Sequence, residues 1–215
     1  MAIDPAHIGR EIPTLVKDAS LVMEKRQTIV DASVKLFIQK GFHSTTTREI
    51  ARAAEMSIGS LYEYVASKED VLYLVCDSIH KQMEAALEEA IDESKSPLDA
   101  LTSAMSDYIT VCDRMQDSIL LIYRETASLD SESQSFVLKN EQRIADLFEK
   151  LLRRGVTEKV FTVADDKALQ LMAHNIVVLG HMWAYRRWFL RDAFLLEEFI
   201  RHQTSLVVGE LTGSN

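Results

Sequence analysis

The 215-residue sequence predicts an all-α protein of about nine helices, and three observations support this fold class. Apolar residues recur every three to four positions along most of the chain, which is the period of a helix with one buried face. Only seven glycines and three prolines are present, so little material is available for the tight turns of a β-protein. No segment sustains the alternation of apolar and polar residues that a half-buried strand needs.

The first three helices are well delimited, the first with about four to five turns and the next two short. Apolar residues from Ile29 to Ile38 predict a helix that begins near Glu24 and stops at Gly41. Thr46-Thr-Arg-Glu49 has the spacing of a capping box and opens a second helix. Ser57 can cap a third helix, with Leu61 and Val65 facing inward.

The remaining helices are longer. Ser67-Lys-Glu-Asp70 is a third capping signal, and Ser96-Pro97 supplies an N-cap followed by a proline at the first helical position. Further breaks are expected near Met115, Leu129–Glu132, Gly155–Thr162 and Arg191–Asp192, with Thr162 and Asp192 as N-caps. The predicted division is an N-terminal extension at 1–20, a helix-turn-helix domain at 21–75 and a larger helical domain at 76–215.

Composition and charge narrow the class of protein. Hydrophobic residues make up 47 % and charged residues 27 %, which is typical of a soluble globular protein. The net charge is −9, yet residues 1–75 hold nine Lys/Arg against ten Asp/Glu, while the rest hold 15 against 23. The nearly neutral first part can therefore carry a DNA-binding face, because phosphates are neutralised contact by contact.

The sequence also predicts a cytoplasmic protein without metal or cofactor. The two cysteines, Cys76 and Cys112, lack metal-ligand or redox spacing and are expected to be reduced thiols. No apolar run approaches the roughly 20 residues that span a bilayer. The N-terminus shows no secretory signal pattern.

The two helices at Thr46–Val65 match a helix-turn-helix, whose second helix enters the major groove while the first crosses the DNA backbone. Hydroxyl and guanidinium groups at the start of the first helix can meet phosphate, and small or tyrosine side chains on the second can approach the groove. The predicted DNA-binding residues are Thr46, Thr47, Arg48, Ser57, Ile58, Gly59, Ser60, Tyr62, Glu63, Tyr64 and Lys68.

The stretch "TTTREIARAAEMSIGSLYEYVASKEDVL" resembles the DNA-binding domain of the tetracycline-repressor (TetR) family over roughly residues 26–75. Two positions depart from the usual family pattern. Glu55 stands where glycine is typical, so the turn must bend differently or accept strain. Val65 stands where phenylalanine is typical, which thins the core beneath the recognition helix.

The resemblance implies a homodimeric, ligand-responsive regulator, most often a repressor, with a C-terminal domain that binds an effector and dimerises. An apolar pocket for a hydrophobic or acyl-coenzyme A effector would be lined by large residues on separate helices, although the same residues could simply fill a core. The candidate lining residues are Met105, Tyr108, Met115, Ile119, Tyr123, Met172, Trp183 and Arg187. The predicted dimer contacts are Ile176, Gly180, Trp188, Phe199 and Leu206.

Other interpretations stay open at this stage. Arg186, Arg187 and Arg191 could bind an anionic ligand, or pair with acids such as Glu197 and Glu198 or with those of a partner subunit. The protein could also be a DNA-binding dimer without an effector.

Two further features have alternative explanations. An all-α enzyme would use His174, His181 and Glu125, although no nucleophile motif accompanies them. Arg10 and Lys17 could form a basic arm that reaches DNA, or belong to a disordered leader or a packed extra turn.

Overall fold

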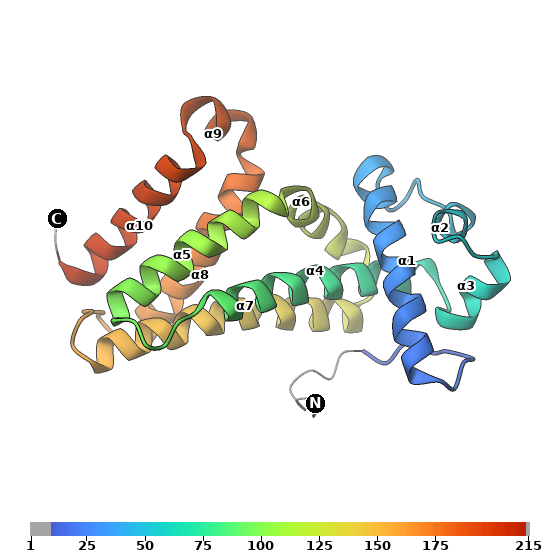
Figure 1. Cartoon of the computed structure of the whole chain (residues 1–215), viewed down its shortest axis with the longest axis horizontal. Helices are drawn as coiled ribbons and strands as arrows, with labels where there is room; N and C mark the ends of the chain where they lie inside the picture. Colours follow the sequence, from blue (N-terminus) through green and yellow to red (C-terminus); the bar gives the residue numbers. More distant parts are fainter. Residues whose placement is uncertain (1–9, 214–215) are drawn as a thin grey trace. The chain divides into compact units, whose positions relative to one another are not determined.

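A computed structural model describes residues 10–213, which form ten α-helices and one short 3-10 helix, with no strand in that range (Figure 1). The all-α prediction is confirmed. The elements in chain order are α1 (Ala19–Lys40), α2 (Thr47–Ala53), α3 (Ile58–Tyr64), α4 (Lys68–Ala90), α5 (Pro97–Arg114), α6 (Gln116–Glu125), η2 (Thr126–Ser128), α7 (Ser131–Thr157), α8 (Asp166–Tyr185), α9 (Arg187–Ala193) and α10 (Leu196–Thr212).

Most helix boundaries follow from local signals in the sequence. Gly41 ends α1 with a φ of 82°, a conformation that glycine adopts without steric cost. Thr46 and Ser57 cap α2 and α3 through their hydroxyl oxygens, and Ser96 caps α5 ahead of Pro97. The predicted breaks around Met115 and before α7 are also confirmed.

Two predicted caps are wrong. The backbone N–H of Thr162 donates to the Leu211 carbonyl at 2.8 Å, which holds this residue against α10 rather than at a helix start. Asp165 caps α8 instead, by accepting a backbone N–H at 2.8 Å. Asp192 lies inside α9, and the Glu198 carboxylate caps the start of α10.

The chain has one helix more than expected because the segment predicted to run unbroken to Arg191 breaks at Arg186. The backbone N–H of Arg186 closes the last turn of α8 on Met182, and α9 begins at the next residue. Arg187 and Arg191 of α9 form ion pairs with Asp117 and Asp113, and these pairs help to fix the orientation of α9.

The described residues form two compact units. Of the described residues, unit 1 comprises 10–80 together with Leu121–Asn140, and unit 2 comprises Lys81–Leu120 together with 141–213. These units differ from the predicted domains, because Leu121–Asn140 packs with the N-terminal helices. The functional division at residues 75 and 76 therefore remains a prediction.

Unit 1 is built around α1, with α2 and α3 beside it (Figure 1). The rings of Phe37 and Phe42 meet edge to face at a centroid distance of 5.5 Å. Arg124 donates to the Phe37 carbonyl at 3.0 Å, and Glu125 accepts the Phe42 N–H at 3.3 Å, so the end of α6 completes the C-terminal end of α1. The fully buried core residues of α1–α3 and the following loop include Ile29, Phe37, Ile50, Leu61 and Val65.

Unit 2 is organised around α5, which runs alongside α8 and α10 (Figure 1). Gly180 allows α8 to approach α5 closely, since a Cβ there would lie 2.6 Å from the Tyr108 ring. Ile109, Trp183, Leu190 and Phe199 form a buried apolar cluster. Within residues 10–213, no helix combines the length and hydrophobicity that crossing a membrane requires.

Candidate nucleic-acid interface

Helices α2 and α3 have two turns each. Isolated helices of this length are marginally stable, so both depend on their caps and on the packing of their buried face. The Glu49 N–H donates to Thr46 Oγ1 at 3.3 Å, and the Thr46 N–H donates to the Glu49 carboxylate at 2.9 Å. Ser57 Oγ accepts the Ser60 N–H at 3.0 Å. These bonds fix where both helices begin.

The turn between the two helices contains backbone strain at Glu55, whose φ is +55°. A non-glycine residue in this left-handed region costs about 1 kcal/mol. The backbone N–H of Met56 donates to the Ala51 carbonyl at 2.9 Å, so the tight turn forms in spite of that cost. Of the two possibilities that the sequence allowed, the turn accepts strain.

A continuous exposed surface joins α2 to α3. The Tyr62 hydroxyl donates to Thr47 Oγ1 at 3.3 Å, and this bond links the two helices on their outer side. The side chains of Tyr62 and Ile58 are 44 % and 39 % exposed, and Gly59 leaves the α3 backbone open between them. No hydrogen bond or ion pair within residues 10–213 engages the exposed Arg48 guanidinium.

Tyr64 does not belong to this surface, which corrects its prediction as a DNA-binding residue. It is only 5 % exposed, because it follows Leu61 by three residues and so lies on the same inward side of α3. Its carbonyl accepts a hydrogen bond from Arg26 Nε at 3.0 Å. Its contribution is to the core of unit 1.

Lys68 is also unavailable in the way that the sequence predicted. Its ammonium donates to the carbonyls of Phe42 and Thr45 at 3.1 Å and of His43 at 3.5 Å. It lies 4.3 Å from the centre of the Phe42 ring as well. All three of its hydrogen-bond donors close the loop between α1 and α2, so none remains for phosphate.

The other predicted residues divide between capping and exposure. The Thr46 hydroxyl donates to the Glu49 carboxylate at 2.9 Å and is therefore occupied by the capping box. Lys40 pairs with Glu49 and, together with Thr46, lowers the pKa of that carboxyl to about 2. Ser60 is half-buried, and the exposed Glu63 side chain adds negative charge to the surface.

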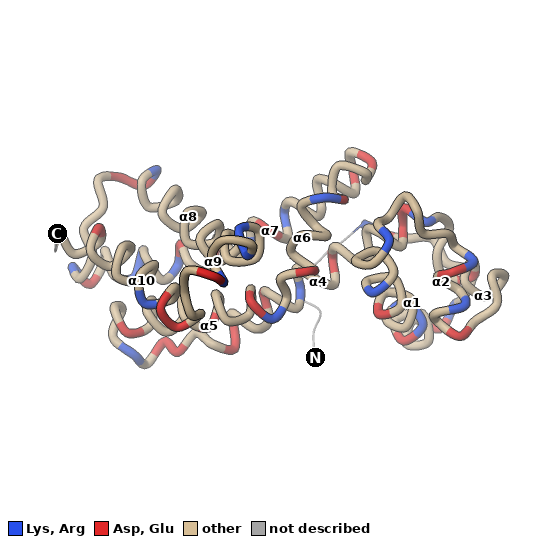
Figure 2. Tube along the Cα trace, turned by 90° about the horizontal axis from the view of Figure 1, so that it is seen from above, with Lys and Arg blue, Asp and Glu red and all other residues tan. Residues whose placement is uncertain are grey.

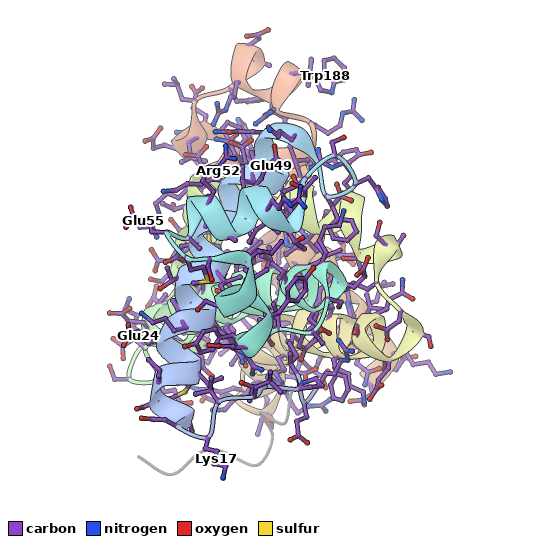
Figure 3. The ribbon with its side chains drawn as sticks, turned by 90° about the vertical axis from the view of Figure 1, so that its right-hand side faces the viewer. Lys17, Glu24, Glu49, Arg52, Glu55 and Trp188 are labelled. Atoms are coloured by element: carbon purple, nitrogen blue, oxygen red, sulfur yellow. The ribbon has the colours of Figure 1, made fainter. Side chains whose placement is uncertain are left out.

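Sequence reasoning missed Arg52, which lies one turn after Arg48 on α2 and is exposed. Within the described residues its guanidinium has no hydrogen bond or ion pair. Figure 2 shows cations and acids interspersed on α1–α3, and Figure 3 shows Arg52 on α2 near Glu49. The spacing of four between Arg48 and Arg52 was the signal that could have identified this second cation.

The candidate effector residues are mostly interior. Tyr108 is fully buried, and its hydroxyl lies 2.9 Å from His181 Nε2. Trp183 is 3 % exposed and donates from Nε1 to Asp113 at 2.8 Å. Of the remaining candidates, Met105 and Ile119 are buried, Met115, Met172 and Arg187 are half-buried, and Tyr123 is half-exposed and belongs to unit 1.

Two of the three arginines around α9 are paired with acids of the same chain. Arg187 pairs with Asp117 at 2.7 Å, and Arg191 pairs with Asp113 at 3.0 Å. Arg186 stacks over the Trp188 ring at 5.1 Å. Pairing with acids is thus the alternative that the structure supports, with acids of α5 and α6 in place of those of α10.

Unit 2 contains a hollow of about 650 Å³ between the end of α4 and α7. Both apolar and charged side chains line it. Arg154 donates to the carbonyls of Glu93 and Lys95, which secures the loop beside it. The lining residues are Glu88, Ile91, Glu93, Leu147, Lys150, Leu151 and Arg154, and none of the predicted effector residues is among them.

The predicted dimer contacts need correction. Ile176, Gly180 and Phe199 are packed inside unit 2, so these three cannot present a surface to a partner subunit. Trp188 and Leu206 are exposed by 68 % and 64 %. Sequence reasoning missed the exposed apolar residues of α8, which are Leu171, Val178 and Tyr185.

The residues of the enzyme hypothesis each have a structural environment of their own. His181 is bonded to Tyr108 inside unit 2, while His174 is exposed. Glu125 is buried in unit 1 and accepts hydrogen bonds from the Phe42 N–H and from Arg124. Among residues 10–213, no three His, Cys, Asp or Glu side chains are grouped as a metal site.

Comparison with known proteins places the chain in a family. The sequence model described as "Bacterial regulatory proteins, tetR family" matches residues 29–73, and "Tetracyclin repressor-like, C-terminal domain" matches residues 94–192. The HTH-type transcriptional regulator HbdR of Aromatoleum sp. (strain CIB) is 30 % identical over 93 % of this chain and 86 % of its own. The repressor KstR2 of Mycobacterium tuberculosis is 22 % identical over 90 % of this chain and 96 % of its own.

Solved structures share the fold. A regulatory protein of the tetR family from Rhodococcus RHA1 has a TM-score of 0.75 and 25 % identity, covering 87 % of this chain and 97 % of its own. AibR in complex with isovaleryl coenzyme A and operator DNA has a TM-score of 0.69 and 18 % identity, covering 85 % and 97 %. The chain belongs to the TetR family of bacterial transcriptional regulators.

Proposed function

We propose that this regulator is a repressor that binds a near-palindromic operator as a homodimer, with the exposed α2–α3 surface as its contact with DNA. The Tyr62–Thr47 hydrogen bond carries this proposal, because it joins the outer faces of both helices into one surface. In a helix-turn-helix, that surface faces the major groove and the flanking phosphates.

Within this surface, we assign the strongest contribution to Arg48. Its guanidinium makes no ion pair with any described residue, so it can bond to phosphate, or bidentately to guanine, without first breaking one. Arg52 supplies a second cation one turn along α2. Lys68 and Tyr64 act on the fold rather than on the DNA.

The proposed dimer face consists of α8 and α10. Leu171, Val178 and Tyr185 are spaced by seven residues, so they lie on one side of α8, and each is more than half exposed. Leu206 extends the apolar surface on α10. Two such faces from two subunits would form a four-helix contact, which sets the distance between the recognition helices.

The effector that we propose is a small, largely apolar or acyl-type molecule that binds in unit 2. AibR, which shares the fold, has been solved with isovaleryl coenzyme A and operator DNA, and another structural neighbour is named a ketosteroid regulator. The Tyr108–His181 pair supplies a polar anchor among apolar side chains. A ligand that prefers one dimer arrangement shifts the population by its differential affinity, typically about 1–3 kcal/mol.

The corresponding experiment measures affinity for the chain's own upstream promoter DNA across a salt series, with scrambled DNA as control. Selective, salt-sensitive binding that one member of a panel of apolar acids and acyl-coenzyme A thioesters releases supports the whole proposal. Selective binding that no compound changes supports the effector-free alternative. Absence of selectivity, followed by failure of a genome-wide operator search, contradicts the proposal.

We further propose that the protein acts in the bacterial cytoplasm and has no catalytic activity, as its relatives are transcriptional regulators. The wild-type protein should therefore convert no effector, and Ala substitution at His174 or His181 should remove no activity. Effector recovered unchanged after prolonged incubation agrees with this assignment, and chemical conversion contradicts it.

A further inference from the structure

The segment Arg10–Asp18, here called the strap, precedes α1 and lies outside both stretches that match the family. It has no regular secondary structure, yet it is bonded along its length to α1, α3 and α4 within unit 1. Ile12 is its apolar anchor and is only 4 % exposed. The sequence left open a basic arm, a disordered leader or a packed extra turn. Residues 10–18 are packed against unit 1 but form no helical turn, and residues 1–9 lie outside the described range.

The middle of the strap closes the end of the recognition helix. The Thr14 hydroxyl donates to the Glu63 carbonyl at 2.8 Å, and the Leu15 N–H donates to the same carbonyl at 2.9 Å. The last carbonyls of a helix have no partner within the helix. In a helix of only two turns, two extra donors at the final turn determine a large share of its end geometry.

Arg26 of α1 connects the strap to the same helix end. Its Nε donates to the Tyr64 carbonyl at 3.0 Å, and its Nη2 donates to the Ile12 carbonyl at 2.8 Å. A planar guanidinium makes these bonds in fixed relative directions. One side chain therefore ties α1, the strap and the end of α3 together.

The other end of the strap is fixed to α4. Arg10 Nη1 pairs with the Asp70 carboxylate at 2.7 Å, and the Arg10 N–H donates to the Tyr73 hydroxyl at 2.8 Å. The second Asp70 oxygen accepts the N–H groups of Ala66 and Ser67, which form the loop that leaves α3. The strap and this loop thus meet on one buried carboxylate.

We propose that the strap is a positioning element for operator recognition, which orients α3 against α1 and α4 without itself contacting DNA. The inference rests on the proposed DNA-binding role of the α2–α3 surface. Arg10 is neutralised by Asp70, so it cannot serve as a free basic arm. The exposed Lys17 at the end of the strap, visible in Figure 3, is the residue by which direct contact can be tested.

The test compares operator and scrambled DNA affinities, and their salt dependence, for Thr14→Val and Arg26→Lys in the full-length protein. Each variant removes donors to the end of α3, so operator binding should weaken roughly fivefold to tenfold. Affinity for scrambled DNA and the salt slope should stay unchanged, because no phosphate contact is lost. Thr14→Ser should restore operator binding.

Leu15→Ala is the matched control, because its side chain is 81 % exposed while its backbone N–H still reaches Glu63. A thermal melt of every variant shows whether folding is kept, and affinities are compared below the lowest midpoint. Unchanged operator affinity in Thr14→Val and Arg26→Lys overturns the proposal.

Lys17→Ala separates positioning from direct contact. Unchanged binding in this variant agrees with the proposal, whereas a parallel loss for both DNAs with a smaller salt slope makes the strap a phosphate contact and overturns it. If wild type and Arg48→Ala bind operator equally, the proposed DNA-binding surface fails instead, and the two failures are distinguishable.

Discussion

The α2–α3 segment of unit 1 and the α5–α8 pair of unit 2 are held together in different ways. In α2–α3, side chains within three residues cap the helix starts, and the outer face stays exposed. Between α5 and α8, contact depends on residues about 70 positions apart, as in the Tyr108–His181 bond and the approach of Tyr108 to Gly180. Local hydrogen bonds fix the first segment, and interior packing fixes the second.

This difference predicts which property a substitution will change. Substitutions of exposed residues in α2–α3 should alter DNA affinity with little effect on folding, because these side chains are not packed in the core. Substitutions of interior residues in the α5–α8 pair should alter the free energy of unfolding, because a close-packed interior accommodates volume changes poorly. Four measurements test this contrast.

Gly180→Ala should have the largest effect. The new Cβ would lie 2.6 Å from the Tyr108 ring and 2.9 Å from Cys112 Sγ, and both side chains are buried. We expect a loss of about 3 kcal/mol in the free energy of unfolding, measured by urea denaturation.

The matched control is Gly59→Ala on α3. Its Cβ would meet only Ser57 Oγ, at 3.7 Å. Stability should stay constant or rise by up to about 1 kcal/mol, since alanine favours helix. An equal loss of stability in both variants would contradict the contrast between the two regions.

Arg48→Ala should lower operator affinity by about 2 kcal/mol and leave the urea midpoint unchanged. The reason is that the Arg48 side chain is exposed and makes no hydrogen bond or ion pair within residues 10–213. Fluorescence anisotropy with labelled operator measures the change. Arg114→Ala is the control, because Arg114 is an exposed arginine at the end of α5 in unit 2. Equal losses in the two variants would disprove the assignment.

Glu55→Gly should stabilise the protein by about 0.5–1 kcal/mol, because glycine adopts a φ of +55° without steric cost. Lys159→Gly relieves the same kind of strain in unit 2, at a φ of 60°, and should give a similar gain in thermal stability. Only Glu55→Gly should also tighten operator binding, since it removes a negative charge near the DNA surface. A tighter complex in both variants would remove this distinction.

The smallest effect concerns the pH dependence of stability. The Glu49 side chain is half-buried, and the bonds from Lys40 and Thr46 hold the pKa of its carboxyl near 2, below its ordinary value. A lowered folded-state pKa means that the stabilisation is present above about pH 4.5 and disappears as the pH falls toward 2. Glu49→Gln should therefore reduce the fall in melting temperature that occurs as the pH is lowered from 4.5 to 2.

Asp166→Asn provides the comparison in unit 2, because Arg153 lowers the pKa of the exposed Asp166 carboxyl in the same direction. Both variants should reduce the fall in melting temperature at acid pH, but only Glu49→Gln should weaken the cap of α2. Identical operator affinities for the two variants at pH 5 would show that the capping box does not support the DNA-binding surface.

The sequence predicts α2–α3 well because its determinants are close together. The capping box at Thr46 and the cap at Ser57 use partners three residues away, and the strain at Glu55 follows from the missing glycine. The roles of Lys68 and Arg26 could not be predicted, because their carbonyl partners lie 14 to 38 residues away and backbone acceptors leave no sequence pattern.

Unit 2 was less predictable for a related reason. Helix α8 is apolar on several faces, so the sequence cannot tell which face packs on α5 and which stays exposed. This ambiguity placed Ile176 and Gly180 at the predicted dimer face and missed Val178. The ion pairs that accompany the break at Arg186 join α9 to residues 70 to 78 positions earlier, which no local signal reveals.

Hydrogen–deuterium exchange with and without operator DNA would test most directly whether the α2–α3 surface contacts DNA. Protection should be concentrated in peptides covering Thr46–Tyr64, with little change over α5 and the C-terminal half of α7 beyond that caused by scrambled DNA at matched salt. Selective operator binding with no added protection in Thr46–Tyr64, or with protection centred elsewhere, would contradict the assigned surface.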